Sequence, residues 1–267
     1  MNKKVFFILI LSVIVFFFAC RQPEKIAPPV PQSNSFTVDL SYFSAPDTAS
    51  SAVNYALAYR NVSFWKFLFE DSLALHKNLF ASVSDKKLEY QDNNTWLISE
   101  KFTENNDTYL ISYFEIIKDD TVFTKLFISL DSTYLYLPLF DGWFLPDSTN
   151  GFWQLNKPDT GNTYVKYIKT DRNFISEYKQ EMKVTYLYPG ENNGNYILIK
   201  DSLLYDYDIY IDIFEKISEN HTYIQFGQQS LIGRVKDLQY FGDTLWHCWD
   251  ENRFDNYSDY NCNFFGY

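Results

Sequence analysis

Most of this chain consists of short segments in which apolar and polar residues alternate. The alternation begins at Lys87 and continues almost to the C-terminus, with polar links such as 104–107 and 190–194 between the segments. A period of two residues is typical of strands that bury one face, and short links between consecutive strands favour hairpins. The pattern therefore predicts a large antiparallel meander sheet over residues 87–267. Strands are expected at 87–90, 95–102, 108–117, 122–130, 133–137, 152–155, 163–170, 183–188, 195–200, 205–214, 222–226 and 232–240.

The segment before the sheet has a helical pattern instead. Apolar residues recur at helical spacing over residues 44–84, and Ser44 and Asp47 are spaced as in a capping box. We expect an amphipathic helix that packs on the sheet, with a possible break at 61–63, where strong apolar residues are lacking. A helix that lies on a membrane or binds a partner is the alternative. Helix and sheet together predict one α+β domain over residues 44–267.

The first twenty residues have the features of an export signal. Two lysines precede an apolar run over residues 5–18, and Ala19 stands directly before Cys20. This run spans about 21 Å as a helix, less than the roughly 30 Å of a hydrocarbon core, so a permanent transmembrane helix is disfavoured. The order resembles the processing site of bacterial lipoproteins. The resemblance implies that residues 1–19 are removed and that Cys20 becomes the acylated N-terminus; a leader cleaved without lipidation and an uncleaved anchor are the alternatives.

The residues after the cysteine extend this interpretation. Arg21 stands where lipoproteins retained in the inner membrane often have Asp, so the resemblance points to the outer membrane of a Gram-negative bacterium. Residues 20–43 are predicted to be a tether, because four prolines lie among them. At about 3.1 Å per residue in polyproline II, residues 21–35 would hold the domain about 45 Å from the bilayer. A short strand is expected at 36–40.

Charge excludes some classes of partner. Removal of the 19-residue leader from 267 residues leaves 248, enough for a domain with a substantial core. The leader contains two lysines and no acids, so 21 basic and 34 acidic residues remain, a net charge of about −13. Nucleic acids and anionic lipids require a basic surface, which argues against both as partners. No cofactor or metal is expected.

The cysteines predict one disulfide. If Cys20 is acylated, Cys248 and Cys262 remain, and an exported compartment is oxidising enough to pair them. Closing a loop of about 15 residues contributes roughly 3 kcal/mol in the chain-entropy model. A zinc site is disfavoured, because His247 is the one further ligand nearby and the spacing matches no structural zinc motif.

One expected strand carries a row of polar side chains. Asp206, Asp208, Tyr210 and Asp212 fall on the same face of that strand. Alternate residues of a strand lie roughly 6.6 to 6.8 Å apart, which is compatible with glycoside hydrolysis by paired carboxylates. The row is a candidate ligand site, and a solvated strand face is the alternative.

Two tryptophans are candidate stacking platforms for a glycan. Trp143 lies in a turn-rich segment, 141–147, and Trp153 follows it closely. Aromatic rings with one exposed face stack on the apolar faces of sugars. The alternative is that these bulky residues cover an edge of the sheet.

The C-terminal segment has the most distinctive composition. It contains Gly-Arg-Val-Lys-Asp at 233–237, Phe-Gly-Asp at 241–243, Trp-His-Cys-Trp-Asp at 246–250 and then Cys262. Over about 30 residues it resembles the ending of a group of uncharacterised bacterial surface lipoproteins. The resemblance implies a surface lipoprotein and no particular activity.

Familiar catalytic fingerprints are absent from the sequence. It contains no Gly-x-Ser-x-Gly, no His-Glu-x-x-His and no phosphate-binding glycine loop. The leading interpretation is a lipid-anchored envelope protein that binds a glycan or another envelope component without catalysis. A carboxylate-dependent polysaccharide hydrolase and a structural or assembly lipoprotein of the periplasmic leaflet are the alternatives.

Overall fold

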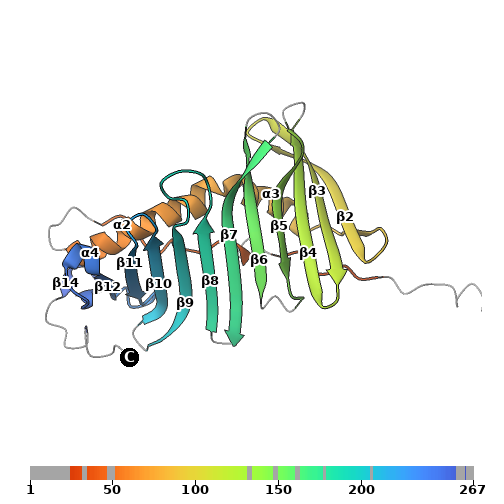
Figure 1. Cartoon of the computed structure of the whole chain (residues 1–267). Coiled ribbons are helices and arrows are strands. Elements are labelled where there is room, and N and C mark those ends of the chain that lie inside the picture. The colour runs from red at the N-terminus through yellow and green to blue at the C-terminus, as the bar shows by residue number, and fades with distance from the viewer. Residues whose placement is uncertain are drawn as a thin grey trace, which may run out of the picture.

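A single open sheet dominates the structure (Figure 1). The computed structural model describes residues 25–31, 35–46, 52–130, 134–146, 150–159, 163–176, 179–204, 207–256 and 262. Its fourteen strands follow the order of the sequence, and each pairs antiparallel with the next. The predicted antiparallel meander is therefore confirmed, and the sheet is open.

The strands are long in the middle of the sheet and short at its edges. Two-residue edge strands leave few unpaired backbone groups, which limits edge-to-edge pairing with other chains. The strands are β1 (Glu89–Tyr90), β2 (Thr95–Glu104), β3 (Asp107–Lys118), β4 (Thr121–Leu130), β5 (Tyr134–Phe144), β6 (Gly151–Asp159), β7 (Thr163–Ser176), β8 (Lys179–Tyr186), β9 (Tyr196–Leu204), β10 (Tyr207–Glu215), β11 (Asn220–Phe226), β12 (Gly233–Asp237), β13 (His247–Trp249) and β14 (Asp255–Asn256).

Three details differ from the prediction. Residues 141–144 belong to β5 rather than to a turn. The last expected strand ends at Asp237, because its carboxylate accepts a hydrogen bond from the Tyr240 N–H and caps the short helix α4 (Leu238–Phe241). Strands β13 and β14, of three and two residues, are too short to show an alternating pattern and were not expected.

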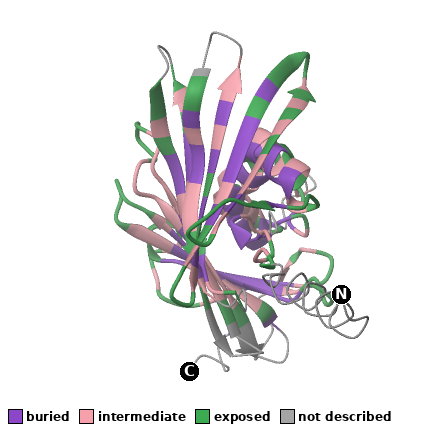
Figure 2. Ribbon diagram, turned by 90° about the vertical axis from the view of Figure 1, so that its right-hand side faces the viewer, coloured by how far each residue is buried: buried purple, intermediate pink, exposed green. Residues whose placement is uncertain are grey.

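The helical segment lies across one side of the sheet. It comprises α2 (Val53–Phe67), a π-helical turn η2 (Leu68–Ser72) and α3 (Ala74–Ser84). Helix α2 contacts β11 to β14 and α3 contacts β2, so the segment runs from one end of the sheet to the other; Figure 2 shows the helices on one side of the curved sheet. None of the helices in the described part of the chain is long and apolar enough to cross a membrane.

The helix begins and bends at places other than those expected. Ser44 is not helical, and α2 begins at Val53. The chain stays helical through 61–63, because Val62 is fully buried in the core. The irregular turn comes later, where the Leu73 N–H donates to the Leu68 carbonyl at 3.0 Å, a bond that spans five residues.

One row of opposed residues runs across the helix-facing side of the sheet. Strand register places one residue from each of β2 to β12 directly opposite the next, so alternation buries the whole row on a single face. The row consists of Trp96, Glu115, Thr124, Gly142, Trp153, Thr170, Val184, Ile197, Ile213, Thr222 and Asp237. Its side chains are buried against the helical segment and form the centre of the core.

The described part of the predicted tether packs on the domain. Phe36, Leu40 and Phe43 are 1%, 2% and 0% exposed, and residues 36–40 are irregular rather than a strand. Lys25 Nζ donates to the Tyr90 hydroxyl at 2.7 Å. Apolar burial thus holds this segment against the fold, and the tether prediction is wrong for residues 36–43. The predicted lipidation site, Cys20, lies outside the described residues.

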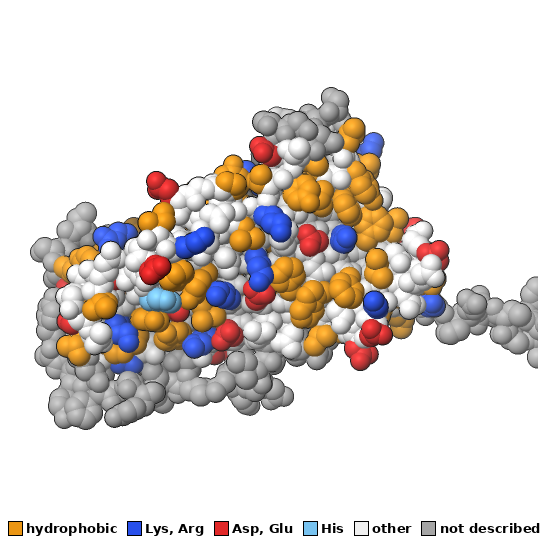
Figure 3. All heavy atoms as spheres, viewed as in Figure 1, with side chains coloured by type: hydrophobic (Ala, Val, Ile, Leu, Met, Phe, Trp, Pro, Cys, Tyr) orange, Lys and Arg blue, Asp and Glu red, His pale blue; other side chains and the backbone are white. Residues whose placement is uncertain are grey.

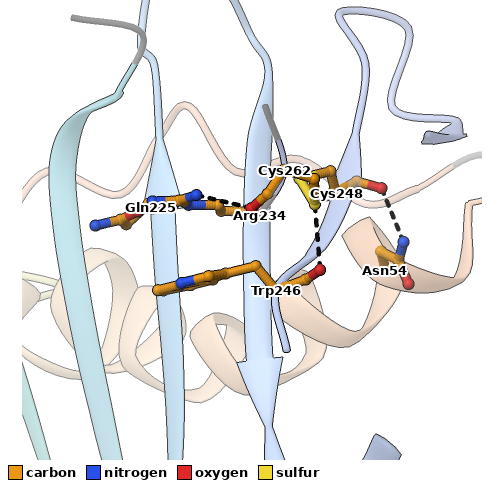
Figure 4. Close-up of a disulfide and its surroundings, with 6 residues drawn as sticks. All are labelled: Asn54, Gln225, Arg234, Trp246, Cys248 and Cys262. Carbon is orange, nitrogen blue, oxygen red and sulfur yellow. Dashed lines mark hydrogen bonds between the residues drawn. A yellow bond between two sulfur atoms is a disulfide. The ribbon is translucent and has the colours of Figure 1, made fainter. Parts of the chain in front are cut away.

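The predicted disulfide is confirmed (Figure 4). Cys248 and Cys262 are bonded, with Cα atoms 5.9 Å apart. Buried Arg234 donates from Nη1 to the Cys262 carbonyl at 2.8 Å and from Nε to Gln225 Oε1 at 2.6 Å. Asn54 of α2 donates to the Cys248 carbonyl at 2.8 Å, so this corner joins the helix, the sheet and Cys262.

Loss of the disulfide should destabilise the fold without abolishing it. The C248S/C262S double variant is expected to unfold with a free energy lower by about 3 kcal/mol, since the closed loop has about 15 residues. Urea denaturation followed by circular dichroism measures this difference. Equal unfolding free energies for variant and wild type would contradict a stabilising cross-link.

A buried carboxyl lies within the row. Glu115 is fully buried and accepts a hydrogen bond from the Tyr113 hydroxyl at 2.7 Å, while its Oε2 atom has no partner among the described residues. Burial raises the pKa of Glu115 to about 7. The folded protein therefore retains a proton on Glu115 at pH values where the unfolded chain has lost it.

Stability should consequently fall as pH rises from about 4.5 through 7, because the folded state then binds more protons than the unfolded one. The full effect is about 3 kcal/mol. Glu115→Gln should remove this decline, with exposed Glu89→Gln as the matched control. Urea midpoints at pH 5 and pH 8 test it. An unchanged pH slope in Glu115→Gln would show that the carboxyl is ionised in the fold.

Candidate functional site

A cleft of about 510 Å³ opens between α2 and the ends of strands β9 to β12. The link between β8 and β9, near α2 at the upper edge of the sheet in Figure 1, contributes one wall. Most of the lining side chains are polar, with aromatic rings among them. They are Arg60, Asn61, Phe64, Trp65, Asn192, Asn195, Ile213, Glu215, Asn220, Asp237, Gln239 and Tyr240.

Asp237 organises the floor of the cleft. It is 4% exposed, and its two carboxylate oxygens each accept from Asn220 Nδ2 at 3.1 Å. Thr222 Oγ1 donates to it at 2.6 Å and the Tyr240 N–H at 3.0 Å. Because these bonds occupy the carboxylate, Asp237 positions its neighbours and does not offer a free charge to a ligand.

The β8–β9 link is held by its own asparagines. Asn193 Nδ2 donates to the Leu187 carbonyl at 2.7 Å, and Asn195 Oδ1 accepts from the Lys216 N–H at 2.9 Å. Gly194 has φ of +97°, and a Cβ there would lie 2.5 Å from the Lys216 side chain. The positive φ favours glycine at this turn, and hydrogen bonds within the protein hold the link in place.

Two exposed charges of opposite sign face the cleft. The Arg60 guanidinium lies 5.4 Å from the ring centroid of Tyr240, whose side chain is 47% exposed. Glu215 accepts a hydrogen bond from Ser218 Oγ at 3.2 Å. Among the described residues, neither Arg60 nor Glu215 makes an ion pair. Both therefore remain available to hydrogen-bond a ligand.

This set of groups suits recognition better than bond cleavage. Amide, guanidinium and carboxylate groups are planar and form paired hydrogen bonds, which suit neighbouring hydroxyl groups. None of the described residues that line the cleft is a histidine, cysteine or serine, so no familiar nucleophile with its base is present there. The described residues also contain no cluster of three potential metal ligands.

The two candidate tryptophans lie on opposite faces of the sheet. Trp143 of β5 is 36% exposed on the outer face, away from the helices. Trp153 of β6 is 2% exposed and belongs to the buried row. Its ring packs over Gly142 and Gly151, where added Cβ atoms would lie 2.9 and 2.1 Å from it. Trp153 is therefore a core residue that a ligand cannot reach.

Tyr210 and Asp212 of the predicted polar face lie on the outer side of β10, whereas the register shifts between Tyr207 and Ile209, so alternation does not place Asp208 on that side. Asp206 lies outside the described residues. Asp208 accepts a hydrogen bond from the Gln228 N–H at 2.9 Å, and Asp212, 8% exposed, lies 2.8 Å from His221 Nδ1. Burial and the nearby Asp212 raise the pKa of Tyr210 well above its usual value. Asp208 and Asp212 are therefore both engaged by other residues of the protein.

Trp143 and this strand face do not form one site. Strands β5 and β10 are separated by five strand spacings of about 4.8 Å, or about 24 Å along the sheet. One sugar ring cannot contact both. The cleft, by contrast, was not predicted, because its residues come from six separate segments of the chain and share no local motif. The run of asparagines at 192–195 was the one local signal for it.

Comparison with protein-family models, curated proteins and solved structures finds no match to this chain.

Proposed function

We propose that this protein is a lipid-anchored envelope protein that binds a glycan in the cleft, without catalysing a reaction. In this proposal Cys20 carries the lipid in the outer membrane, and the domain presents the cleft to its ligand. The leader resembling those of lipoproteins supports the anchor, and the composition of the cleft supports the ligand class. An envelope protein as the ligand is the alternative.

The observation that carries the ligand class is the combination of Tyr240, Arg60 and Glu215 in one cleft. A half-exposed aromatic ring offers a flat surface for the apolar face of a sugar. The guanidinium and carboxylate beside it, which form no ion pair within the described part of the chain, offer donors and acceptors for sugar hydroxyls. Asp237 and the asparagine-rich link fix this arrangement in advance, which lowers the entropic cost of binding.

A hydrolytic function gains no such support. Retaining and inverting glycosidases both need two carboxyl groups directed at one bond. In the cleft, hydrogen bonds occupy the carboxylate of Asp237, so Glu215 is the one carboxylate among the described lining residues that could act on a substrate. On β10, Asp208 is bonded to Gln228 of the β11–β12 link and Asp212 to His221 of β11. We therefore favour binding over hydrolysis.

Substitutions in the cleft should weaken glycan binding. Tyr240→Ala and Arg60→Ala are each expected to reduce affinity about tenfold, or about 1.4 kcal/mol. The matched control is Tyr164→Ala, since Tyr164 is 46% exposed outside the cleft. A panel of bacterial surface oligosaccharides identifies a ligand, and titration calorimetry measures the affinities. Unchanged affinity in both cleft variants would exclude the cleft as the binding site.

The anchor is tested independently. Metabolic labelling with an alkyne fatty acid should mark the wild type strongly and Cys20→Ala at least tenfold less, because the thiol is the acylated group. Protease treatment of intact cells then reports whether the domain is exposed at the surface. Equal labelling of the two proteins would contradict lipidation at Cys20.

A further inference from the structure

The outer face of the sheet carries an exposed apolar row. Ile116, Phe123, Trp143 and Phe152 lie directly opposite one another on β3, β4, β5 and β6. The first three are 41%, 42% and 36% exposed. Figure 3 shows hydrophobic side chains gathered over this part of the face. Soluble domains rarely expose adjoining apolar side chains over several strands, so the row suggests a contact surface.

Aromatic side chains extend this row along the strands. Phe127 stacks on Tyr136 with ring centroids 4.5 Å apart, and Tyr136 is 53% exposed. We call this surface the apolar face; it consists of Ile116, Phe123, Phe127, Tyr136, Trp143 and Phe152. It spans three strand spacings, about 14 Å.

The charges around the apolar face differ from those of the whole chain. The chain has 34 acidic and 23 basic residues. On β2 to β5, alternation directs Lys101, Lys118 and Lys125 outward together with a single acid, Asp141. These strands are therefore less acidic than the chain as a whole, although Asp171 on β7 lies opposite Phe152, and Asp119 and Asp120 form the β3–β4 turn. Tryptophan, tyrosine and lysine are also the residues enriched where proteins meet the headgroup region of a bilayer.

The proposed anchor begins at the same end of the sheet as the apolar face, on the helix-facing side of β1, because Tyr90 lies opposite Trp96 of the buried row. Lys25 is held on β1 by its hydrogen bond to Tyr90, and it lies 4.5 Å from the Tyr90 ring centroid. Only residues 21–24 separate Lys25 from Cys20, a reach of at most about 18 Å. Strand β3 lies two strand spacings from β1, about 10 Å. A bilayer that holds Cys20 must therefore lie beside this end of the sheet.

We infer that the apolar face rests on the bilayer that holds the lipid anchor. This inference depends on the proposed anchor and not on the proposed glycan. The phospholipid surface is the occupant that the short chain to Cys20 brings within reach. The opposite, helix-bearing side then faces away from the membrane, and the cleft with it. Strands β4 and β10 are about 29 Å apart, so the cleft also lies at the distal end of the sheet.

The test uses the fluorescence of Trp143. The lipidated protein is reconstituted on vesicles of phosphatidylethanolamine and phosphatidylglycerol, with or without bromine on the acyl chains, and the vesicle-bound fraction is collected by flotation. Bromine quenches tryptophans that contact lipid. Trp65, Trp96, Trp153 and Trp249 are at most 3% exposed and are shielded. Quenching of roughly one sixth of the emission is expected, since the chain has six tryptophans, and Trp143→Phe should abolish it.

Two charge-introducing variants locate the contact. Ile116→Glu/Phe123→Glu should still float with the vesicles but lose at least half of the quenching. Ile217→Glu/Leu238→Glu places the same charges at side chains that are 74% and 57% exposed elsewhere and should leave it unchanged. Floating wild-type protein whose fluorescence is insensitive to bromine would overturn the inference and leave the anchor intact, as would quenching that persists in Trp143→Phe. Protein that fails to float would remove the anchor, and this inference with it.

Discussion

The burial of one side of an open sheet by a single helical segment is the constraint on which the structure depends. An open sheet must bury the apolar side chains of at least one of its two faces against another element, and fourteen strands make that face large. Trp65 of α2 and Phe80 of α3 are each 1% exposed and belong to the same core as the buried row. Phe36 adds a third contact from the N-terminal side, so residues far apart in sequence close one core.

Sequence alternation predicted most of the sheet because it reflects this one-sided burial. It failed where local signals and packing disagree. Gly142 and the residues beside it were interpreted as a turn, yet Gly142 is in β5, where the Trp153 ring leaves no room for a side chain. The break in the helix was expected at 61–63, but the irregular turn lies at 68–72. No residue type in this turn predicts the π-helical hydrogen bond from the Leu73 N–H to the Leu68 carbonyl.

The candidate site was much less accessible from the sequence. The sequence grouped the acids at 206–212 on one strand face, but Asp206 lies outside the described residues and the register shifts between Tyr207 and Ile209. The neighbour on β11 that engages Asp212 could not be known from the sequence. The cleft depends on long-range register, because Asp237 meets Asn220 and Thr222 only when β11 and β12 pair. Disulfide pairing was simpler, since Cys248 and Cys262 are the two cysteines left near the C-terminus.

Because residues 25–31 and 35–43 pack on the domain, the free chain between a lipid at Cys20 and the domain would be much shorter than the predicted tether. A tether of 45 Å would let the domain take any orientation, whereas a link of about 18 Å to a lipid anchor would keep one end of the sheet at the bilayer. At such a short distance the effective concentration of lipid surface is high, so a modest apolar contact is sufficient to fix the orientation. The packing that completes the core would therefore keep one end of the sheet at the membrane, and the apolar face would then decide which side of the sheet meets the lipid.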